Sequence, residues 1–378
     1  MTAITRFQLR NQWAWASGAL VIALIAPLIL PSYWLHVVIV ALFYAALASS
    51  WSFLAGYAGQ FSWAHMAFMA IGAYTSGILG RYLNLPPLPG MVLGTLASGL
   101  AGLAIGALVL RFKATYLALF TIAFSEILRI VLKAEADITR GDLGLSLAPL
   151  FGNTISKAPY YYTMLAILLG SLLVLYWLTR SRVGMFVKAI REDEQAAAAR
   201  GVDVVRYKVL SFVVTSMIAG LAGTFSAHYI TIITPNILVL PQMGVVMAMA
   251  IIGGVESLIA AALGGIIIQV SLELLREFGA WRLVLFGALL VITLRFARNG
   301  LIAPLFQRLF HLGPRAELQK EATSDGACNS AGGQALRRHS SSEWHLAAHL
   351  WQRARWPHRS QWVGDNHYGQ YHRRRIPA

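Results

Sequence analysis

The sequence predicts an all-α protein that crosses a membrane many times. Of its 378 residues, 57% are hydrophobic and only 12% are charged, and the mean hydropathy is +0.60. A soluble domain carries about a quarter charged residues, so this chain lacks the side chains for a water-facing surface. The same figures exclude disorder for most of the length, and the single Cys328 excludes a disulfide-rich scaffold.

Apolar stretches recur at the length that crosses a bilayer, which needs about 20 residues. Nine such stretches lie at residues 14–30, 35–55, 62–80, 88–110, 116–133, 160–179, 209–231, 259–275 and 281–298. The first stretch follows basic residues but has no small-residue cleavage site, so it is expected to be an uncleaved span. A shorter run, 244–253, forms either a buried half-helix or part of a tenth span. The predicted fold has about ten (8–10) transmembrane helices, a short broken or re-entrant segment and an irregular C-terminal tail.

Basic residues predict the orientation, because cytoplasmic loops carry an excess of Lys and Arg. The loop 180–208 holds seven of them and is the strongest cytoplasmic prediction. The other basic positions that indicate a cytoplasmic side are Arg6, Arg10, Arg111, Lys113, Arg295, Arg298 and Arg308. An even number of crossings between the loop and Arg298 then favours a crossing by 244–253. Both termini are expected in the cytoplasm, and the segment 134–158 is expected outside.

A short amphipathic helix is predicted inside the cytoplasmic loop. Residues 187–200 contain strong helix formers and no Pro or Gly, and Gly201 suits a helix stop. The apolar positions are Val187, Ile190 and the region of Ala197 and Ala198. Two interpretations stay open from the residues alone, namely a charged loop on the lipid surface and a docking helix for a cytoplasmic partner.

The segment 52–77 combines glycines with polar side chains beside a predicted span. The glycines are Gly56, Gly59 and Gly72, and the polar residues are Gln60, Ser62 and His65. Polar side chains at membrane depth are costly unless they face a bundle or a cavity. The pattern therefore favours a broken or re-entrant helix beside a substrate path, although His65 alone is more simply explained as an interhelical hydrogen-bond partner.

Other spans contain small residues and one charge pair. Glu126 and Arg129 are three residues apart on one helix face, so they are expected to neutralise each other. Tight helix packing is predicted at Gly94, Gly99, Gly102, Gly106, Gly220, Gly223, Gly264 and Gly265. No phosphate loop, metalloprotease motif or nucleophile elbow occurs in residues 1–311, so an enzyme is not indicated.

These segments together resemble the LivM-type permease subunits of ATP-binding-cassette importers for branched-chain amino acids. Residues 56–74 resemble that family's GYAGQxSxGHxxFxxIGAY signature, and residues 116–127 resemble its YLAxxTxAFxEI segment. Residues 189–208 are similar to its coupling motif, and Gly253-Gly254 falls at its GG turn. The resemblance covers roughly residues 30–310.

Two positions depart from the family's pattern. Ala64 stands where Gly is usual, which is expected to perturb that turn slightly. Residues 139–145 read TRGDLGL where TGGxxGL is usual, so Arg140 replaces a Gly. This second departure bears on the substrate and on the contact with a binding protein.

The resemblance implies a multi-pass subunit of a bacterial inner-membrane importer without catalytic residues, metal or cofactor of its own. Its implied partners are a homologous second permease, two cytoplasmic ATPases that bind ATP, a periplasmic or lipid-anchored substrate-binding protein and membrane lipid. The residues implied in ATPase coupling, in a helix spanning 187–201, are Lys188, Arg191, Glu192, Asp193, Glu194, Ala197, Ala198 and Gly201. The residues implied in the translocation path are Gln60, Ser62, His65, Tyr74 and Glu126. The alternative is a stand-alone, ion-driven secondary transporter, which would need no docking helix.

The composition of residues 312–378 differs from that of the rest of the chain. The chain is therefore divided into a permease domain, 1–311, and a basic tail, 312–378, that is expected to be disordered. The tail carries ten of the 31 Lys and Arg residues and six of the ten His residues. A nucleic-acid-binding arm is one interpretation of this charge. The other is out-of-frame translation, because shifting the frame across residues 356–377 allows a glycine-rich string that resembles an ATPase phosphate loop. Asp365 there allows only Thr or Ile where the loop needs Lys, so no active ATPase is expected. No nucleic-acid partner is expected either.

Overall fold

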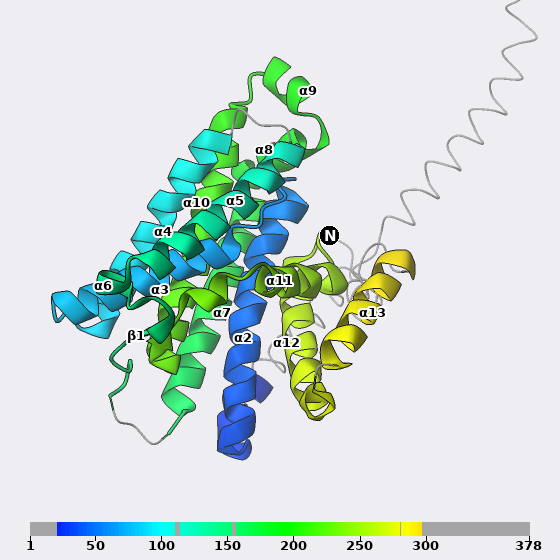
Figure 1. Ribbon diagram of the computed structural model, residues 1–378. Helices are drawn as coiled ribbons and strands as arrows, with labels where there is room; N and C mark the ends of the chain where they lie inside the picture. The colour runs from blue at the N-terminus through cyan, green and yellow to red at the C-terminus, as the bar shows by residue number, and fades with distance from the viewer. Residues whose placement is uncertain (1–20, 110–113, 153–155, 280, 297–378) are drawn as a thin grey trace, which may run out of the picture. The chain divides into compact units, whose positions relative to one another are not determined.

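The computed structural model describes residues 21–109, 114–152, 156–279 and 281–296, and Figure 1 shows their arrangement. The tail 312–378 and the basic residues Arg6, Arg10, Arg111, Lys113, Arg298 and Arg308 lie outside the described residues.

Helices dominate the described part of the chain, beginning with a helical stretch at residues 21–29. The α-helices that follow are α2 (Ser32–Ser52), α3 (His65–Tyr82), α4 (Pro87–Val109), α5 (Ala114–Ala134), α6 (Ala136–Thr139), α7 (Ala158–Arg180), α8 (Arg182–Glu192), α9 (Glu194–Ala199), α10 (Val204–Ile230), α11 (Leu240–Gly253), α12 (Leu258–Leu274) and α13 (Trp281–Phe296). The short elements are the π-helix η1 (Phe53–Tyr57), the 3-10 helices η2 (Gly141–Leu143), η3 (Pro235–Leu238) and η4 (Leu275–Phe278), and the strands β1 (Leu145–Ser146) and β2 (Ile232–Ile233).

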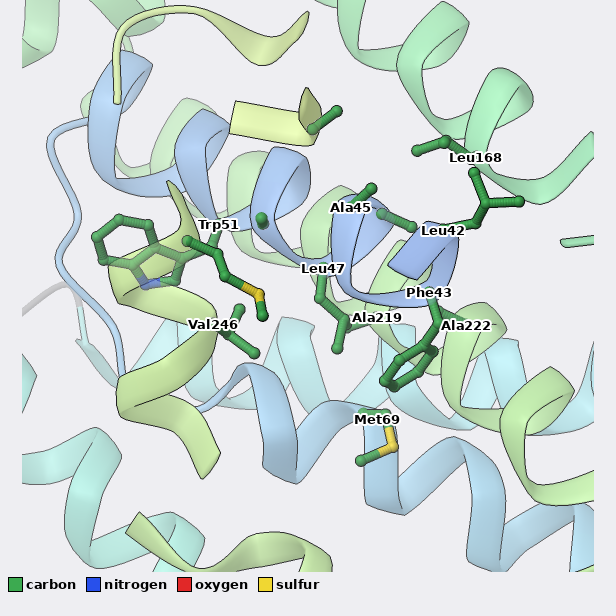
Figure 2. Packing of buried hydrophobic residues seen from close by; sticks show 14 of the residues in the cluster. Leu42, Phe43, Ala45, Leu47, Trp51, Met69, Leu168, Ala219, Ala222 and Val246 are labelled. Atoms are coloured by element: carbon green, nitrogen blue, oxygen red, sulfur yellow. The ribbon is translucent and has the colours of Figure 1, made fainter. Parts of the chain in front are cut away.

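The helix α2 is the central element of the core. It contacts α7, α10, α11 and α12, and 83% of the most apolar window in Ser32–Tyr57 is buried. Figure 2 shows its side chains, from Leu42 to Trp51, facing Leu168 of α7, Ala219 of α10 and Val246 of α11. An inner helix surrounded by other helices needs no polar face, which explains why α2 is apolar all round.

Glycines let α3, α4 and α10 pack closely, as the sequence predicts. A Cβ added to Gly72 would lie 2.6 Å from the Gly220 carbonyl oxygen, and one added to Gly102 would lie 2.0 Å from Ser216 Oγ. Any larger residue at either position would force these helices apart. In lipid such close backbone approach favours helix association through van der Waals contact.

Every predicted span overlaps a helix, and five of the described segments are long and apolar enough to cross a membrane. These five are Ser32–Tyr57, Pro87–Leu108, Ala158–Arg180, Val204–Ile230 and Leu258–Phe278. The run 244–253 lies in α11, whose 14 residues extend only about 21 Å at 1.5 Å per residue. Eight of its residues are buried, so α11 is a short helix inside the bundle. The chain is an all-α, multi-pass membrane protein.

A pair of short β-strands involves the segment 134–158, which the sequence predicts to be external. β1 pairs antiparallel with β2, with Leu145 opposite Ile233 and Ser146 opposite Ile232. The sequence analysis misses this pair, because two-residue strands have no period to detect. Its effect is to tie the loop before α7 to the end of α10.

Candidate functional site

The helical structure is interrupted between α2 and α3, where the sequence predicts a broken helix; this interruption is called the break below. α2 continues into the π-helix η1, and residues 58–64 are irregular before α3 begins at His65. Gly59 adopts a left-handed φ of 66°, which favours glycine. π-helical turns occur frequently at functional sites, so this break is the first candidate element.

Side chains from neighbouring helices hold the irregular segment in place. Trp51 Nε1 donates to the Ser62 carbonyl at 2.9 Å, and the Trp63 amide donates to Thr121 Oγ1 of α5 at 3.0 Å. Ser125 Oγ of α5 donates to the Trp63 carbonyl at 3.2 Å, and Ser62 Oγ accepts from the Ala64 amide. Sequence reasoning assigns no role to Thr121 or Ser125. The available signals are two hydroxyl residues four apart on an apolar helix and the position of Thr121 in the segment 116–127.

Three of the predicted path residues are buried without hydrogen bonds for their polar atoms. Gln60, His65 and Tyr74 are at most 3% exposed, and in the described part of the chain their side-chain polar atoms have no hydrogen-bond partner. For His65 the Ser50 carbonyl approaches the ring but falls outside the limits of a hydrogen bond. Unsatisfied buried polar groups are rare and indicate a bound water, an ion or a second conformation.

The five predicted path residues do not form one cluster. Gln60, Ser62 and His65 lie at the break, whereas Tyr74 packs further along α3 among Leu145, Leu147 and Ile233. Glu126 lies on α5 and pairs with Arg129 at 2.5 Å, as predicted. The Glu126 side chain is 46% exposed, so this pair is not buried in the bundle.

A separate cavity of about 310 Å³ lies between α2, α3, α10 and the start of α11. Its wall is mostly apolar and includes Ile39, Phe43, Met69 and Phe225. Its polar lining residues include Tyr44, Ser226, Thr234, Asn236 and Gln242. None of the five predicted path residues lines it. An apolar wall with a few polar groups is typical of small-molecule sites, which range from about 300 to 1,000 Å³.

The predicted helix 187–201 is two helices rather than one, so that prediction is wrong in its continuity. The chain is extended at Asp193, which separates α8 from α9. Asp193 Oδ1 accepts from the amides of Gln195 and Ala196 at 2.9 and 3.0 Å. This is an N-cap, and the capping preference of Asp outweighs the helix propensity of its neighbours. Gly201 has a φ of 81° just after α9 ends, which confirms the predicted stop.

The buried and exposed faces of α8 and α9 follow the sequence pattern in part. Val187, Ile190 and Ala197 are buried as expected, whereas Ala198 is exposed. Phe186 of α8 also packs on Tyr207 of α10, with ring centroids 5.1 Å apart. Lys188 and Glu192 are exposed, and the exposed Glu194 pairs with Lys208 of α10 at 2.6 Å. Figure 1 shows both helices at one end of the bundle.

Arg191 turns toward the body of the protein, an arrangement that sequence reasoning misses. Its guanidinium donates to the Gly56 carbonyl at the end of η1 and pairs with Glu256 at 2.5 Å. Glu256 lies in the turn between α11 and α12, two residues after Gly254. One side chain of α8 thus contacts both the break after α2 and the Gly253-Gly254 turn.

The two departures from the expected pattern have opposite structural consequences. Ala64 has φ −89° and ψ 0°, which any L-residue adopts, so the expected perturbation of that turn does not occur. Arg140 has φ 62°, in the left-handed region that favours glycine. A residue other than Gly therefore has a backbone cost at position 140, where it is Arg, but none at position 64, where it is Ala.

Comparison with known proteins finds similarity to transport permeases. The family described as branched-chain amino acid transport system / permease component matches residues 33–294. The high-affinity branched-chain amino acid transport system permease protein LivM of Salmonella typhimurium is 29% identical over 310 residues, which cover 75% of this chain and 73% of the relative. LivH of the same organism is 24% identical over 68% of this chain and 91% of its own length. The fructose import permease protein FrcC of Rhizobium meliloti is 26% identical over 59% of this chain and 67% of its own length. No solved structure matches the chain.

Proposed function

Because the chain belongs to the family of branched-chain amino acid transport system permease components, we propose that it forms part of the translocation path of an ATP-binding-cassette importer for branched-chain amino acids. The observation that carries the proposal is the family match over residues 33–294, which contain the break, the cavity and α8 with α9. The chain is a transport subunit and not an enzyme.

The proposed assembly contains partners that supply binding and energy. The similarity to both LivM and LivH supports pairing with a homologous second permease. Two cytoplasmic ATPases would bind ATP, and a periplasmic or lipid-anchored binding protein would deliver the substrate. The membrane is the bacterial inner membrane. We propose ten spanning segments, with the short α11 forming part of one of them, and with the loop 180–208 and both termini in the cytoplasm.

The exposed side of α8 and α9 is the proposed ATPase contact. Lys188 and Glu192 extend from it, and Met185 adds a large apolar side chain that is 62% exposed. An apolar anchor with charged neighbours suits a groove on a partner protein. Ala198 and Gly201 lie at the far end of the same loop, and Ala197 and Asp193 hold its shape.

The cavity is the proposed contact for the substrate side chain. Its wall of Ile39, Phe43, Met69 and Phe225 suits an aliphatic side chain. Its polar residues suit the charged amino and carboxylate groups of a free amino acid. Gln60, Ser62, His65, Tyr74 and Glu126 stay as proposed path residues, and the unsatisfied polar atoms of Gln60, His65 and Tyr74 support a role in a second conformation.

Uptake competition tests the substrate. Proteoliposomes that contain the full complex should take up labelled leucine, and isoleucine and valine should compete, while fructose, glutamate and urea should not. Ile39→Ala enlarges the cavity, so phenylalanine should gain about tenfold as a competitor, the lower end of what an apolar pocket discriminates. The matched control, Ile127→Ala, removes a side chain that is 61% exposed and should change nothing. Competition by fructose or urea but not by valine would contradict the proposed substrate.

A further inference from the structure

Three separate parts of the chain meet at Arg191. The first is the end of η1, where the Gly56 carbonyl accepts from the guanidinium. The second is the turn after α11, where Glu256 pairs with the same guanidinium at 2.5 Å. The third is the irregular segment, because a Cβ added to Gly59 would lie 3.0 Å from Arg191 Cγ. The Arg191 side chain is 29% exposed, so it is largely enclosed by these contacts.

The two breaks that Arg191 contacts also contact each other. Ser52 Oγ donates to the Val255 carbonyl at 2.7 Å. A Cβ on Gly56 would lie only 1.9 Å from the Val255 carbonyl oxygen, so the π-helix rests directly on the turn. Gly254 has a φ of 128°, a conformation that side-chain-bearing residues rarely adopt. Both contacts lie where a regular α-helix is interrupted, and kinks in helices are found at such interruptions.

The chemistry of these contacts suits the transmission of movement. The last carbonyls of a helix lack intrahelical partners, and Arg191 supplies a charged donor to one of them. An exposed ion pair alone would contribute little, and Glu256 is 68% exposed. A planar guanidinium, however, can hold two acceptors at fixed angles, which the point charge of Lys cannot do.

We propose that Arg191 is a positioning residue that passes movement of α8 to the break after α2 and to the Gly253-Gly254 turn. This inference rests on the proposed function, because the movement of α8 would come from the partner ATPases. This role differs from a direct contact with the ATPase, since the Arg191 side chain faces the permease itself. Loss of Arg191 should therefore leave the complex assembled and hydrolysing ATP while uptake per ATP falls.

The test compares three variants in the full reconstituted complex. With Arg191→Gln, the yield of ATPase bound to the permease and the rate of ATP hydrolysis should stay near wild type. Leucine taken up per ATP hydrolysed should fall about tenfold, a typical size for an allosteric coupling between sites. Arg191→Lys should be intermediate. The matched control is Arg81→Gln, which removes an exposed arginine at the end of α3, outside α8 and α9, and should behave as wild type.

A double-mutant cycle tests the contact itself. If Arg191 and Glu256 act as a unit, Glu256→Gln should also reduce the uptake ratio, and the double variant should lose no more than Arg191→Gln alone. Fully additive losses would overturn the inference, as would a loss of bound ATPase from the Arg191→Gln complex. An equal loss in Arg81→Gln would also overturn it.

A readout independent of substrate separates this inference from the proposed function. Amide hydrogen exchange of residues 53–61 should change when nucleotide binds the wild-type complex and should not change in Arg191→Gln. The same change in both complexes would overturn the inference. Absence of leucine uptake by the wild-type complex would overturn the proposed substrate instead, and the exchange measurement would still decide the role of Arg191.

Discussion

Arg140 shows how a single residue can impose a local cost on this fold. It lies between α6 and η2 with a φ of 62°, and Gly141 follows with a φ of 51°. Around it, Thr139 Oγ1 donates to the carbonyls of Leu132 and Glu135 and accepts from the Gly141 amide, so the turn is fixed by its neighbours. The left-handed conformation of a residue with a Cβ costs about 1–2 kcal/mol, and this turn imposes it.

Replacing Arg140 by Gly should stabilise the protein. Removal of the Cβ relieves the backbone cost, although greater freedom of the unfolded chain offsets part of the gain, so the net effect should be about 0.5–1 kcal/mol. The measurement is the thermal unfolding midpoint in detergent at one scan rate. Arg140→Ala is the matched control, because it removes the same exposed side chain but keeps the Cβ. Equal midpoints for Gly and Ala would contradict the backbone argument.

The residues also indicate what the sequence could and could not predict. Glycine at 201, the pair of Glu126 with Arg129 and the buried Val187 and Ile190 follow from local spacing and are confirmed. The inward position of Arg191 joins residues 135 and 65 positions apart, and no local pattern encodes such a contact. Contacts between distant segments depend on how the helices pack, which periodicity does not specify.

At the scale of elements, the sequence predicts the helices better than it predicts where they are interrupted. The sequence predicts the spans well, because apolar length decides them, and every predicted span overlaps a helix. It predicts one helix over 187–201, whereas Asp193 ends α8 and caps α9. Side-chain capping competes with helix propensity, so a run of good helix formers can still be interrupted by one Asp.

The Asp193 cap provides a test of this element. Asp193→Ala removes the acceptor for the amides of Gln195 and Ala196, so α9 should lose about 1 kcal/mol of local stability. Hydrogen exchange of residues 195–200 should quicken by about fivefold, which is the corresponding change in the opening equilibrium. Asp193→Asn keeps the acceptor and should exchange as wild type. Unchanged exchange in Asp193→Ala would mean that packing alone defines α9.

At the scale of the whole molecule, the described residues form a bundle around α2, and α8 and α9 at one end of it carry the proposed ATPase contact. α2 lies inside, and α3, α4 and α10 pack closely through glycines. The cavity opens beside α2, while α8 and Arg191 lie against the break at which α2 ends. The same helix therefore connects the proposed substrate contact with the proposed ATPase contact, as coupled transport requires.

The central claim is that this chain moves branched-chain amino acids by using ATP hydrolysed on partner subunits. The most direct measurement is leucine uptake into proteoliposomes that contain the permease pair, the ATPases and the binding protein. Uptake should require ATP on the ATPase side, persist when ionophores collapse all ion gradients, and stop when the catalytic site of the ATPase is inactivated. Leucine uptake by the permease without ATPases, driven by an ion gradient and abolished by ionophore, would contradict the account.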